Sequence, residues 1–420
     1  MALVGRLVDV APNPLLVARS LWDRPGVAVL TAGFGAGRCF VACDPTESVD
    51  TLDPEPALPL VRGAGPLAAV PRWVGVLPYE CRRSLERERL TRNPDLRPEP
   101  HLSSPRWLRY PAVAVVSDHV LVVGDSRAAV AQLAGFLQRT PQQRPARIEL
   151  AEPPEPGQAH ESRVRAALEL IAAGELYQVN LARRFSLHVD GRPHDLLALL
   201  SPRGLPPYGL ALDLGDTQVV STSPELFLSV ESDRRVLTAP IKGTRPRGMH
   251  AADDERLTLE LDRDPKERAE LVMILDVERN DLGRVADTGT VRLVEPPHVS
   301  TLPTVHHRLA TLAARLRPTV SRGELLEGTL PSGSVTGAPK VRAMEVIAQL
   351  ERHRRGLYTG ALGTVMHDGT LRLGMAIRTL TVRQGGGHYY SGGGIVADSD
   401  PARELEETHW KALQIAALSR

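Results

Sequence analysis

Residues 238–247 read Thr238-Ala239-Pro240-Ile241-Lys242-Gly243-Thr244-Arg245-Pro246-Arg247, with a β-like run before the lysine and a turn rich in glycine and proline around it. The lysine is conspicuous because the chain has 51 lysines and arginines, and only these are lysines: Lys242, Lys266, Lys340 and Lys411. An arginine keeps its proton near neutral pH and cannot replace an amine that acts as nucleophile or base. Lys242 is therefore a candidate nucleophile; the alternative is a chance survivor of arginine-rich codon use.

The composition is that of a soluble globular protein, with 42% hydrophobic and 24% charged residues. The 420 residues are enough for one large domain or two ordinary ones. The formal net charge of +1 argues against a dedicated nucleic-acid binder, which would carry a strong basic excess. We therefore expect no nucleic-acid partner.

The cysteines are few and odd in number: Cys39, Cys43 and Cys81. Such a set fits a reducing compartment better than a disulfide framework or a zinc site. The N-terminal residues lack the apolar core of a signal peptide, and no apolar run reaches membrane-spanning length. These features predict a cytoplasmic protein without a membrane partner.

The N-terminal region, residues 1–150, alternates short apolar runs with turns. Strands are predicted at residues 27–30, 73–77, 113–116 and 120–123, and an amphipathic helix at residues 128–139. Charged residues 82–92 and proline-rich residues 93–104 indicate an exposed loop. Residues 141–157 contain several prolines without apolar periodicity, which predicts a linker to a second region at 158–420.

The second region mixes helices with strands, which predicts an α/β architecture. Helices are expected at residues 161–173, 253–278, 324–330, 340–351 and 401–418. Strands are expected at residues 177–182, 218–222 and 226–230, and a meander of three more at 357–366, 371–382 and 388–396.

Two of these helices carry carboxylates at helical spacing. Glu267 and Glu270 lie at i and i+3, as do Glu404 and Glu407, so each pair shares a helix face, and Lys411 lies one turn beyond Glu407. Carboxylates that face one another from two helices suit Mg²⁺, which prefers a few hard oxygen ligands and an anionic substrate. By spacing alone, solvated surface acids are the more common outcome.

Glycine-rich segments provide two further candidates for ligand contact. Residues 332–338 run through small residues into the N-terminus of a helix, which suits a carboxylate or phosphate, although a tight turn is equally compatible. The Walker spacing that ATP binding needs is absent. Gly392-Gly393-Gly394 follows a predicted strand and could let a ligand approach the backbone. His306-His307 lacks partners at metal-ligand spacing and suits ordinary packing.

Several ordered segments together resemble one family. They are Gly174-Glu175-Leu176-Tyr177-Gln178-Val179-Asn180-Leu181, Ser223-Pro224-Glu225, Pro240-Ile241-Lys242-Gly243-Thr244-Arg245, and residues 266–283, 333–340, 392–399 and 404–411. This order from about residue 160 to the C-terminus resembles the chorismate-binding enzymes. Residues 74–80 extend the similarity weakly into the N-terminal region.

The resemblance implies a fold of two packed, largely antiparallel β-sheets flanked by helices, with chorismate as substrate and Mg²⁺ as cofactor. It assigns the metal carboxylates to Glu267, Glu270, Glu404 and Glu407, and the general acid to Glu225. It assigns substrate contacts to Ser334, Gly337, Tyr358, Arg378, Gly394 and Lys411, and places His307 near the substrate ring. Lys266 and Lys340 are expected to serve helix packing and turn geometry.

Within the family, Lys242 favours aminodeoxychorismate synthases, because anthranilate synthases generally carry alanine in the matching Pro-Ile-x-Gly-Thr motif. In the mechanism that the resemblance implies, the Lys242 amine attacks chorismate covalently before ammonia displaces it. Gln178 stands where isochorismate and salicylate synthases have a water-activating lysine, which favours amination over hydroxylation. Ser332 departs from the glycine frequent in the Pro-Gly-Gly-Ser turn, and no segment matches the tryptophan pocket of the family.

The predicted function is therefore ammonia-dependent formation of 4-amino-4-deoxychorismate, with ammonia from a separate glutamine amidotransferase subunit. The nearest alternative is the large subunit of anthranilate synthase. A catalytically inactive relative with a binding role is a second alternative, and an arginine-rich nucleic-acid binder is a distant third.

Overall fold

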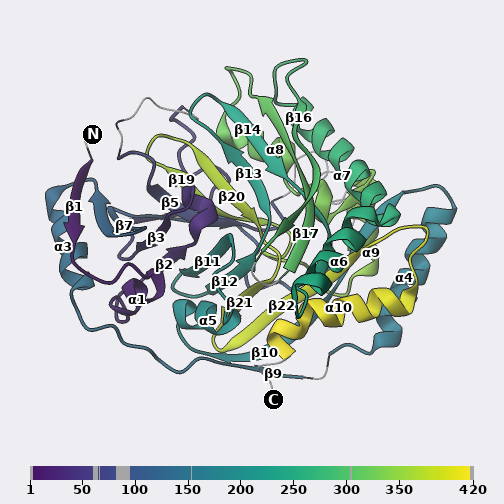
Figure 1. Cartoon of the computed structure of the whole chain (residues 1–420), viewed down its shortest axis with the longest axis horizontal. Coiled ribbons are helices and arrows are strands. Elements are labelled where there is room, and N and C mark those ends of the chain that lie inside the picture. The colour runs from purple at the N-terminus through teal and green to yellow at the C-terminus, as the bar shows by residue number, and fades with distance from the viewer. Residues whose placement is uncertain are drawn as a thin grey trace.

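A computed structural model of the protein contains two large β-sheets with helices packed around them (Figure 1). The structure describes residues 3–59, 65, 67–81, 95–152, 154–302 and 305–416. The predicted charged loop at 82–92 and the end of the last predicted helix lie outside these residues. All strand pairs among the described residues are antiparallel. The fold predicted from the resemblance is confirmed.

The first sheet has twelve strands within the described residues. In spatial order these are β1 (Val4–Val8), β8 (Val120–Gly124), β7 (Ala112–Val116), β3 (Cys39–Ala42), β2 (Ala28–Leu30), β11 (Tyr208–Asp213), β12 (Gln218–Ser223), β21 (Thr379–Arg383), β22 (Gly386–Ile395), β10 (Gln178–Asp190) and β18 (Gly337–Ala338). The short strand β9 (Arg147–Leu150) also pairs with β10. The region predicted as a linker, residues 141–157, therefore contains a strand, which its prolines concealed.

The second sheet has ten strands within the same described residues. In spatial order these are β15 (Ile241–Pro246), β17 (Val305–Arg315), β14 (Arg235–Ala239), β13 (Leu226–Val230), β20 (Leu371–Met375), β19 (Ala361–Met366), β5 (Pro71–Leu77), β6 (Arg106–Arg109) and β4 (Glu47–Val49), with β16 (Arg292–Thr301) paired to β17. The predicted meander is thus divided, because β19 and β20 lie in this sheet and β21 and β22 in the other. Arg378 stands at the crossover in the left-handed region, with φ of 50°.

The helices within the described residues are α1 (Pro14–Arg19), α3 (Arg127–Leu137), α4 (Gly157–Ala172), α5 (Pro193–Leu200), α6 (Ala251–Arg263), α7 (Pro265–Gly283), α8 (Arg322–Thr329), α9 (Lys340–Leu350) and α10 (Pro401–Ala416). Two short 3-10 helices are η1 (Ala32–Gly35) and η2 (Gly333–Val335). The helix predicted at 253–278 is two helices, because Asp264 has extended backbone and its side chain caps α7, where Pro265 occupies the first turn. None of the described helices is long and apolar enough to cross a membrane.

Apolar side chains fill the space between the sheets and cover their outer faces. Leu30, Phe40 and Leu210 of the first sheet pack with Val74 and Leu362 of the second in one buried cluster. Such interdigitation of two inner faces is what holds stacked sheets together. A second cluster joins the first sheet to α1, α3, α5 and α10, and a third joins the second sheet to α7 and α8.

Strands from residues 3–150 and from residues 158–416 are hydrogen-bonded within both sheets. A buried ion pair adds to this connection, because the Arg322 guanidinium at the start of α8 donates to Asp53 Oδ1 at 2.6 Å. Both side chains are almost completely buried. The two sequence regions therefore share sheets and a buried contact.

Replacing Arg322 with Met is expected to destabilise the protein by about 3–5 kcal/mol, because it leaves the Asp53 carboxylate buried without its partner. Chemical denaturation would measure the loss as a fall in the midpoint. The double variant Arg322→Met with Asp53→Leu should recover part of this loss. If the single variant is as stable as the parent, the ion pair does not connect the two regions energetically.

Candidate active site

Lys242 lies on β15 at a bulge, where Ile241 pairs with Leu309 but Thr244 pairs with His307. Two residues of β15 thus face one of β17, an arrangement that turns a side chain out of the regular alternation. The bulge requires a glycine at position 243, because a φ of 83° is unfavourable for other residues and because Glu267 and Leu261 leave no room for a side chain. The Lys242 ammonium donates to the backbone carbonyl of Ser334 at 3.2 Å.

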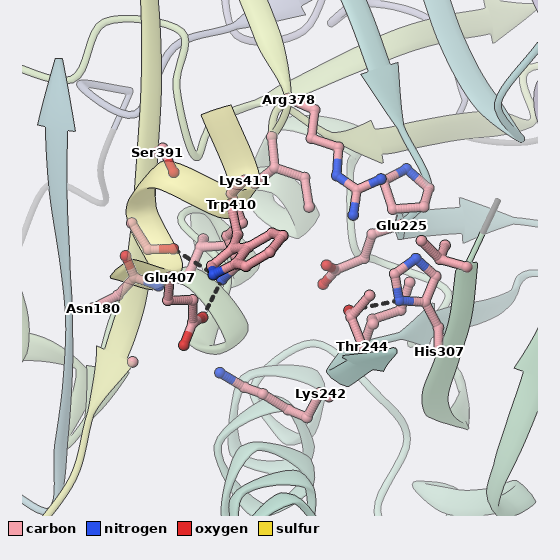
Figure 2. Close-up of a pocket in the computed structure, with 18 of the residues that line it drawn as sticks. Asn180, Glu225, Lys242, Thr244, His307, Arg378, Ser391, Glu407, Trp410 and Lys411 are labelled. Atoms are coloured by element: carbon pink, nitrogen blue, oxygen red, sulfur yellow. Dashed lines mark hydrogen bonds and ion pairs between the residues drawn. The ribbon is translucent and has the colours of Figure 1, made fainter. Parts of the chain in front are cut away.

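Glu225 follows β12 in the Ser-Pro-Glu segment and lies on the same side of the cavity as Thr244, His307 and Arg378 (Figure 2). Its Oε1 accepts a hydrogen bond from the Ser334 hydroxyl at 2.9 Å. Burial, together with the nearby Glu278 charge, raises its pKa to about 7, although Ser334 and Lys242 oppose the rise. Glu225 can therefore hold and release a proton near neutral pH.

His307 points one ring nitrogen at β15 and keeps the other free. Its Nδ1 shares a hydrogen bond with the Thr244 hydroxyl at 2.9 Å, and its buried Nε2 has no partner among the described residues. Burial and the Arg378 charge lower the pKa of His307 to about 3, so the ring is neutral. The neighbouring His306 is buried, bonds to Asp254 and Thr301, and does not line the cavity.

Basic and aromatic groups also line the cavity. Lys411 on α10 pairs with Glu407 at 2.6 Å and donates to the Gly392 carbonyl at 3.0 Å (Figure 2). The Arg378 guanidinium lines the cavity and makes no hydrogen bond or ion pair with the described residues. An unpaired guanidinium beside a cavity suits a carboxylate ligand. Tyr358 also lines the cavity and is stacked on Tyr390 with 5.2 Å between ring centroids.

The four predicted metal carboxylates face one another from α7 and α10. Burial, with the charges of the neighbouring carboxylates, raises the pKa of Glu267, Glu270 and Glu404. Burial also favours a higher pKa for Glu407, but the positive charge of Lys411 outweighs burial and lowers the pKa of Glu407 overall. The Lys266 ammonium lies 3.8 Å from Glu270 and 3.7 Å from Glu404, so this lysine bridges the two helices by charge.

The carboxylate set suits a hard divalent cation in its chemistry. The buried Oε2 of Glu404 has no hydrogen-bond partner among the described residues, and the repulsion within the set would fall if a cation bound. The carboxylates are not drawn together into a closed ligand shell, since no three acidic, histidine or cysteine side chains in the described part are arranged to hold a metal ion. Glu270 and Glu407 line the cavity, and Glu404 lies behind Gly393.

A cavity of about 990 Å³ collects most of the predicted site residues. The lining includes Lys242, Glu225, His307, Ser334, Tyr358, Arg378, Gly394, Lys411, Glu267, Glu270 and Glu407. Gly337 and Glu404 are outside the lining. Gly337 instead pairs with Val179 of β10, where a side chain would meet the Gln178 carbonyl. Gln178 itself is buried behind Gly394 and does not line the cavity.

Several lining residues had no role in the sequence-based prediction. Asn180 belongs to a quoted motif, and its buried Oδ1 lacks a partner among the described residues, so it is available to a ligand. Trp410 stands beside Lys411 at the rim and is 64% exposed, and Arg203 and Arg403 also line the rim. The position of this tryptophan directly before a predicted substrate lysine was a sequence signal that could have identified this part of the rim.

A sequence model of the chorismate binding enzyme family matches residues 38–417, which include every residue described above as lining the cavity. The chain belongs to the chorismate-binding enzyme family. The family assignment inferred from the ordered motifs is thereby confirmed, and the match extends through most of the N-terminal region.

Members of the family with two different names are similar to the chain. It is 46% identical to anthranilate synthase component 1 of Thermus thermophilus over 61% of this chain and 55% of the relative. It is 42% identical to aminodeoxychorismate synthase component 1 of Klebsiella aerogenes over 58% of this chain and 54% of the relative. The crystal structure of anthranilate synthase component I from Streptococcus pneumoniae superposes with a TM-score of 0.72 at 25% identity, covering 100% of this chain and 92% of that one.

The matches to these curated chorismate-binding relatives span about half of the relatives' length. Their names divide between the two synthases at similar identity. Overall similarity therefore establishes the family, and the choice of reaction depends on individual residues of the site.

Proposed function

We propose that this chorismate-binding enzyme catalyses the Mg²⁺-dependent amination of chorismate by ammonia to 4-amino-4-deoxychorismate, on the route to p-aminobenzoate and folate. The proposal rests on the placement of Lys242. Anthranilate synthases generally carry an alanine at the matching position, and an alanine has no amine that could act as a nucleophile. The Lys242 ammonium bonds to the Ser334 carbonyl, while the hydroxyl of the same serine bonds to Glu225. One residue thus holds a nucleophile and an acid at one cavity wall.

In the proposed reaction the neutral Lys242 amine attacks C2 of chorismate, and the C4 hydroxyl departs. Glu225 gives its proton to that hydroxyl, which leaves as water, and becomes a carboxylate. The Lys242 nitrogen keeps both of its protons in the adduct, so when ammonia forms a bond to C4, the bond between that nitrogen and C2 breaks with its electron pair on nitrogen, and Lys242 leaves as the neutral amine. The proton released from the added nitrogen returns to Glu225, so chorismate and ammonia become aminodeoxychorismate and water.

The charged walls suit a substrate with two carboxylates. Lys411, Arg378, Tyr358 and the backbone turn around Ser334 all line the cavity, where they supply positive charge, a hydroxyl and amides. The Arg378 guanidinium has no partner among the described residues that an anion would have to displace. Glu270 and Glu407, with Glu267 and Glu404 beside them, would hold Mg²⁺. The bound ion would act as a Lewis acid and would orient the substrate.

Ammonia is proposed to come from a separate glutamine amidotransferase subunit. The support is the designation "component 1" in the names of relatives of both kinds, which indicates a second component in those systems. The pair would form a heterodimer with this chain as the chorismate-converting subunit.

Anthranilate synthase component I is the second candidate, favoured by the 46% identity to a relative of that name. An assay with purified protein, chorismate, Mg²⁺ and an ammonium salt separates the two. We expect a product that an added aminodeoxychorismate lyase converts to p-aminobenzoate, and no product when Mg²⁺ is chelated. Fluorescent anthranilate without p-aminobenzoate would establish the second candidate. Failure to consume chorismate with any ammonia source would indicate an inactive relative with a binding role.

A further inference from the structure

A row of hydrogen-bonded side chains runs from Glu225 away from the cavity and into the protein. Glu225 Oε1 bonds to the Ser334 hydroxyl at 2.9 Å, and that hydroxyl lies 3.0 Å from the Ser332 hydroxyl. The Ser332 hydroxyl bonds in turn to Glu278 Oε1 on α7. Glu278 is almost fully buried and does not line the cavity. Two buried carboxyls are therefore joined by two hydroxyls.

The number of hydrogens in this row is limited. Three bonds join the four groups, and each bond needs one hydrogen, but the two serine hydroxyls supply only two. The Ser334 backbone N–H already donates to Ser332 Oγ, which leaves that oxygen one hydrogen to donate and one lone pair to accept. All three bonds are made only if Glu225 or Glu278 carries a proton.

The charged groups around both carboxyls fit one shared proton. Glu278 faces Lys340 of α9 and Asp281 of its own helix, which are paired with each other, and lies 3.5 Å from the Thr238 hydroxyl of β14. Burial, with the Asp281 charge, raises the pKa of Glu278. Glu225 faces Lys242, with Arg378 also within electrostatic range. Neither carboxyl forms a direct ion pair with these cations within the described residues, since Lys340 pairs with Asp281 and the other cations act on the carboxyls only at longer range.

We propose that Glu225 and Glu278 share one proton through the hydroxyls of Ser332 and Ser334, so that Glu278 is a positioning residue that keeps Glu225 supplied with its acidic proton. The assignment of Glu225 as the acid rests on the proposed function, but the sharing of the proton does not. Two carboxyls that share one proton titrate as a pair.

The transfer moves three hydrogens and changes no other bond. The carboxylic acid of Glu278 gives its proton to Ser332 Oγ, Ser332 gives its hydrogen to Ser334 Oγ, and Ser334 gives its hydrogen to the Glu225 carboxylate. Glu278 is then ionised, Glu225 is the acid, and both serines are neutral hydroxyls as before. A glycine at position 332, as in the Pro-Gly-Gly-Ser turn, would interrupt the row.

Infrared titration of the resting protein tests the shared proton without any turnover. The carbonyl stretch of a protonated carboxylic acid should persist in the parent protein near neutral pH. In the Glu278→Gln variant, the band of the protonated Glu225 should disappear at a pH about one unit lower than in the parent, because the negative charge of Glu278 is removed. Glu225→Gln should move the band of Glu278 in the same direction, since the coupling is reciprocal. Bands that do not move in either variant would overturn the proposal.

The pH dependence of kcat provides the second test. Glu278→Gln and Ser332→Ala should each move the alkaline limb about one pH unit lower. In Ser332→Ala, the Ser334 hydroxyl has only Glu225 to donate to, which favours the ionised form. Ser332→Thr should restore the parent profile. A lower kcat with an unmoved limb in both variants would indicate a merely structural role and would refute the sharing.

A matched pair outside the cavity serves as the control. The Ser229 hydroxyl of β13 donates to Oε1 of Glu231, just after that strand, at 2.8 Å, and neither residue lines the cavity. Ser229→Ala and Glu231→Gln should leave the infrared titration and the pH profile unchanged. If no variant or parent converts chorismate but the infrared titration behaves as expected, the proposed function fails and the shared proton stands. If turnover is found and Glu278→Gln moves neither measurement, only the sharing fails.

Discussion

Lys242→Arg is expected to lower kcat for amination on the order of 10³-fold or more, while chorismate still binds. The guanidinium keeps a positive charge near the Ser334 carbonyl, so the electrostatics of that wall change little. It cannot become the neutral amine that attacks carbon. Steady-state kinetics with ammonium salt measures the loss, and calorimetry with chorismate measures the binding that remains.

Intact-mass spectrometry examines the covalent step of Lys242 directly. The parent protein, incubated with chorismate and Mg²⁺ without ammonia, should gain the mass of chorismate less one water. Lys242→Arg should gain nothing under the same conditions. As a control, Arg256→Lys on the exposed face of α6 makes the reverse exchange away from the cavity and should form the adduct normally. Turnover by Lys242→Arg at the parent rate would remove the lysine from the covalent role.

Glu225→Gln is expected to lower kcat by about 10²–10⁴-fold, the usual contribution of a general acid. The amide is nearly isosteric and can still accept the Ser334 hydroxyl at its oxygen, but it has no acidic proton to give. Because the substitution also removes a buried carboxyl that is ionised at high pH, the variant should be no less stable than the parent above pH 7. Thermal unfolding would therefore separate a chemical defect from misfolding.

The pH profile of the parent gives the sign of the effect. Burial raises the pKa of Glu225 to about 7, so the acid is protonated below that pH and ionised above it. Activity should therefore be present below about pH 7 and decline as the pH rises through that value. The Glu225→Gln variant should show a low rate without this alkaline decline. A parent rate that stays constant from pH 6 to pH 9 would contradict the assignment of Glu225 as the acid.

Local patterns in the sequence predicted much of the fold and the character of the site. Apolar patterns identified the strands β5, β7, β8, β12 and β13 and the helices α3, α9 and α10 with small errors at their ends. The shared helix face of each glutamate pair, and the contact between Lys411 and Glu407, were predictable from the spacing because a helix determines which residues share a face. The ordered motifs gave the family.

Other features depend on contacts between residues far apart in the chain. The strands at 361–395 look alike in sequence, yet they divide between two sheets, because the chain crosses over where Arg378 takes a left-handed conformation. Strand β9 is short and follows prolines, and it exists because β10 offers it an edge. No local pattern carries either result.

The sequence by itself thus determined which chemical groups the protein contains, above all Lys242, one of only four lysines among 51 lysines and arginines. Only the tertiary structure decided what those groups can do. Ser334 meets both Lys242 and Glu225, and Ser332 meets Glu278, 54 positions away in the chain. The physical reason is that a pKa and a hydrogen-bond partner depend on burial and neighbours in space, which the packing of the two sheets and their helices supplies.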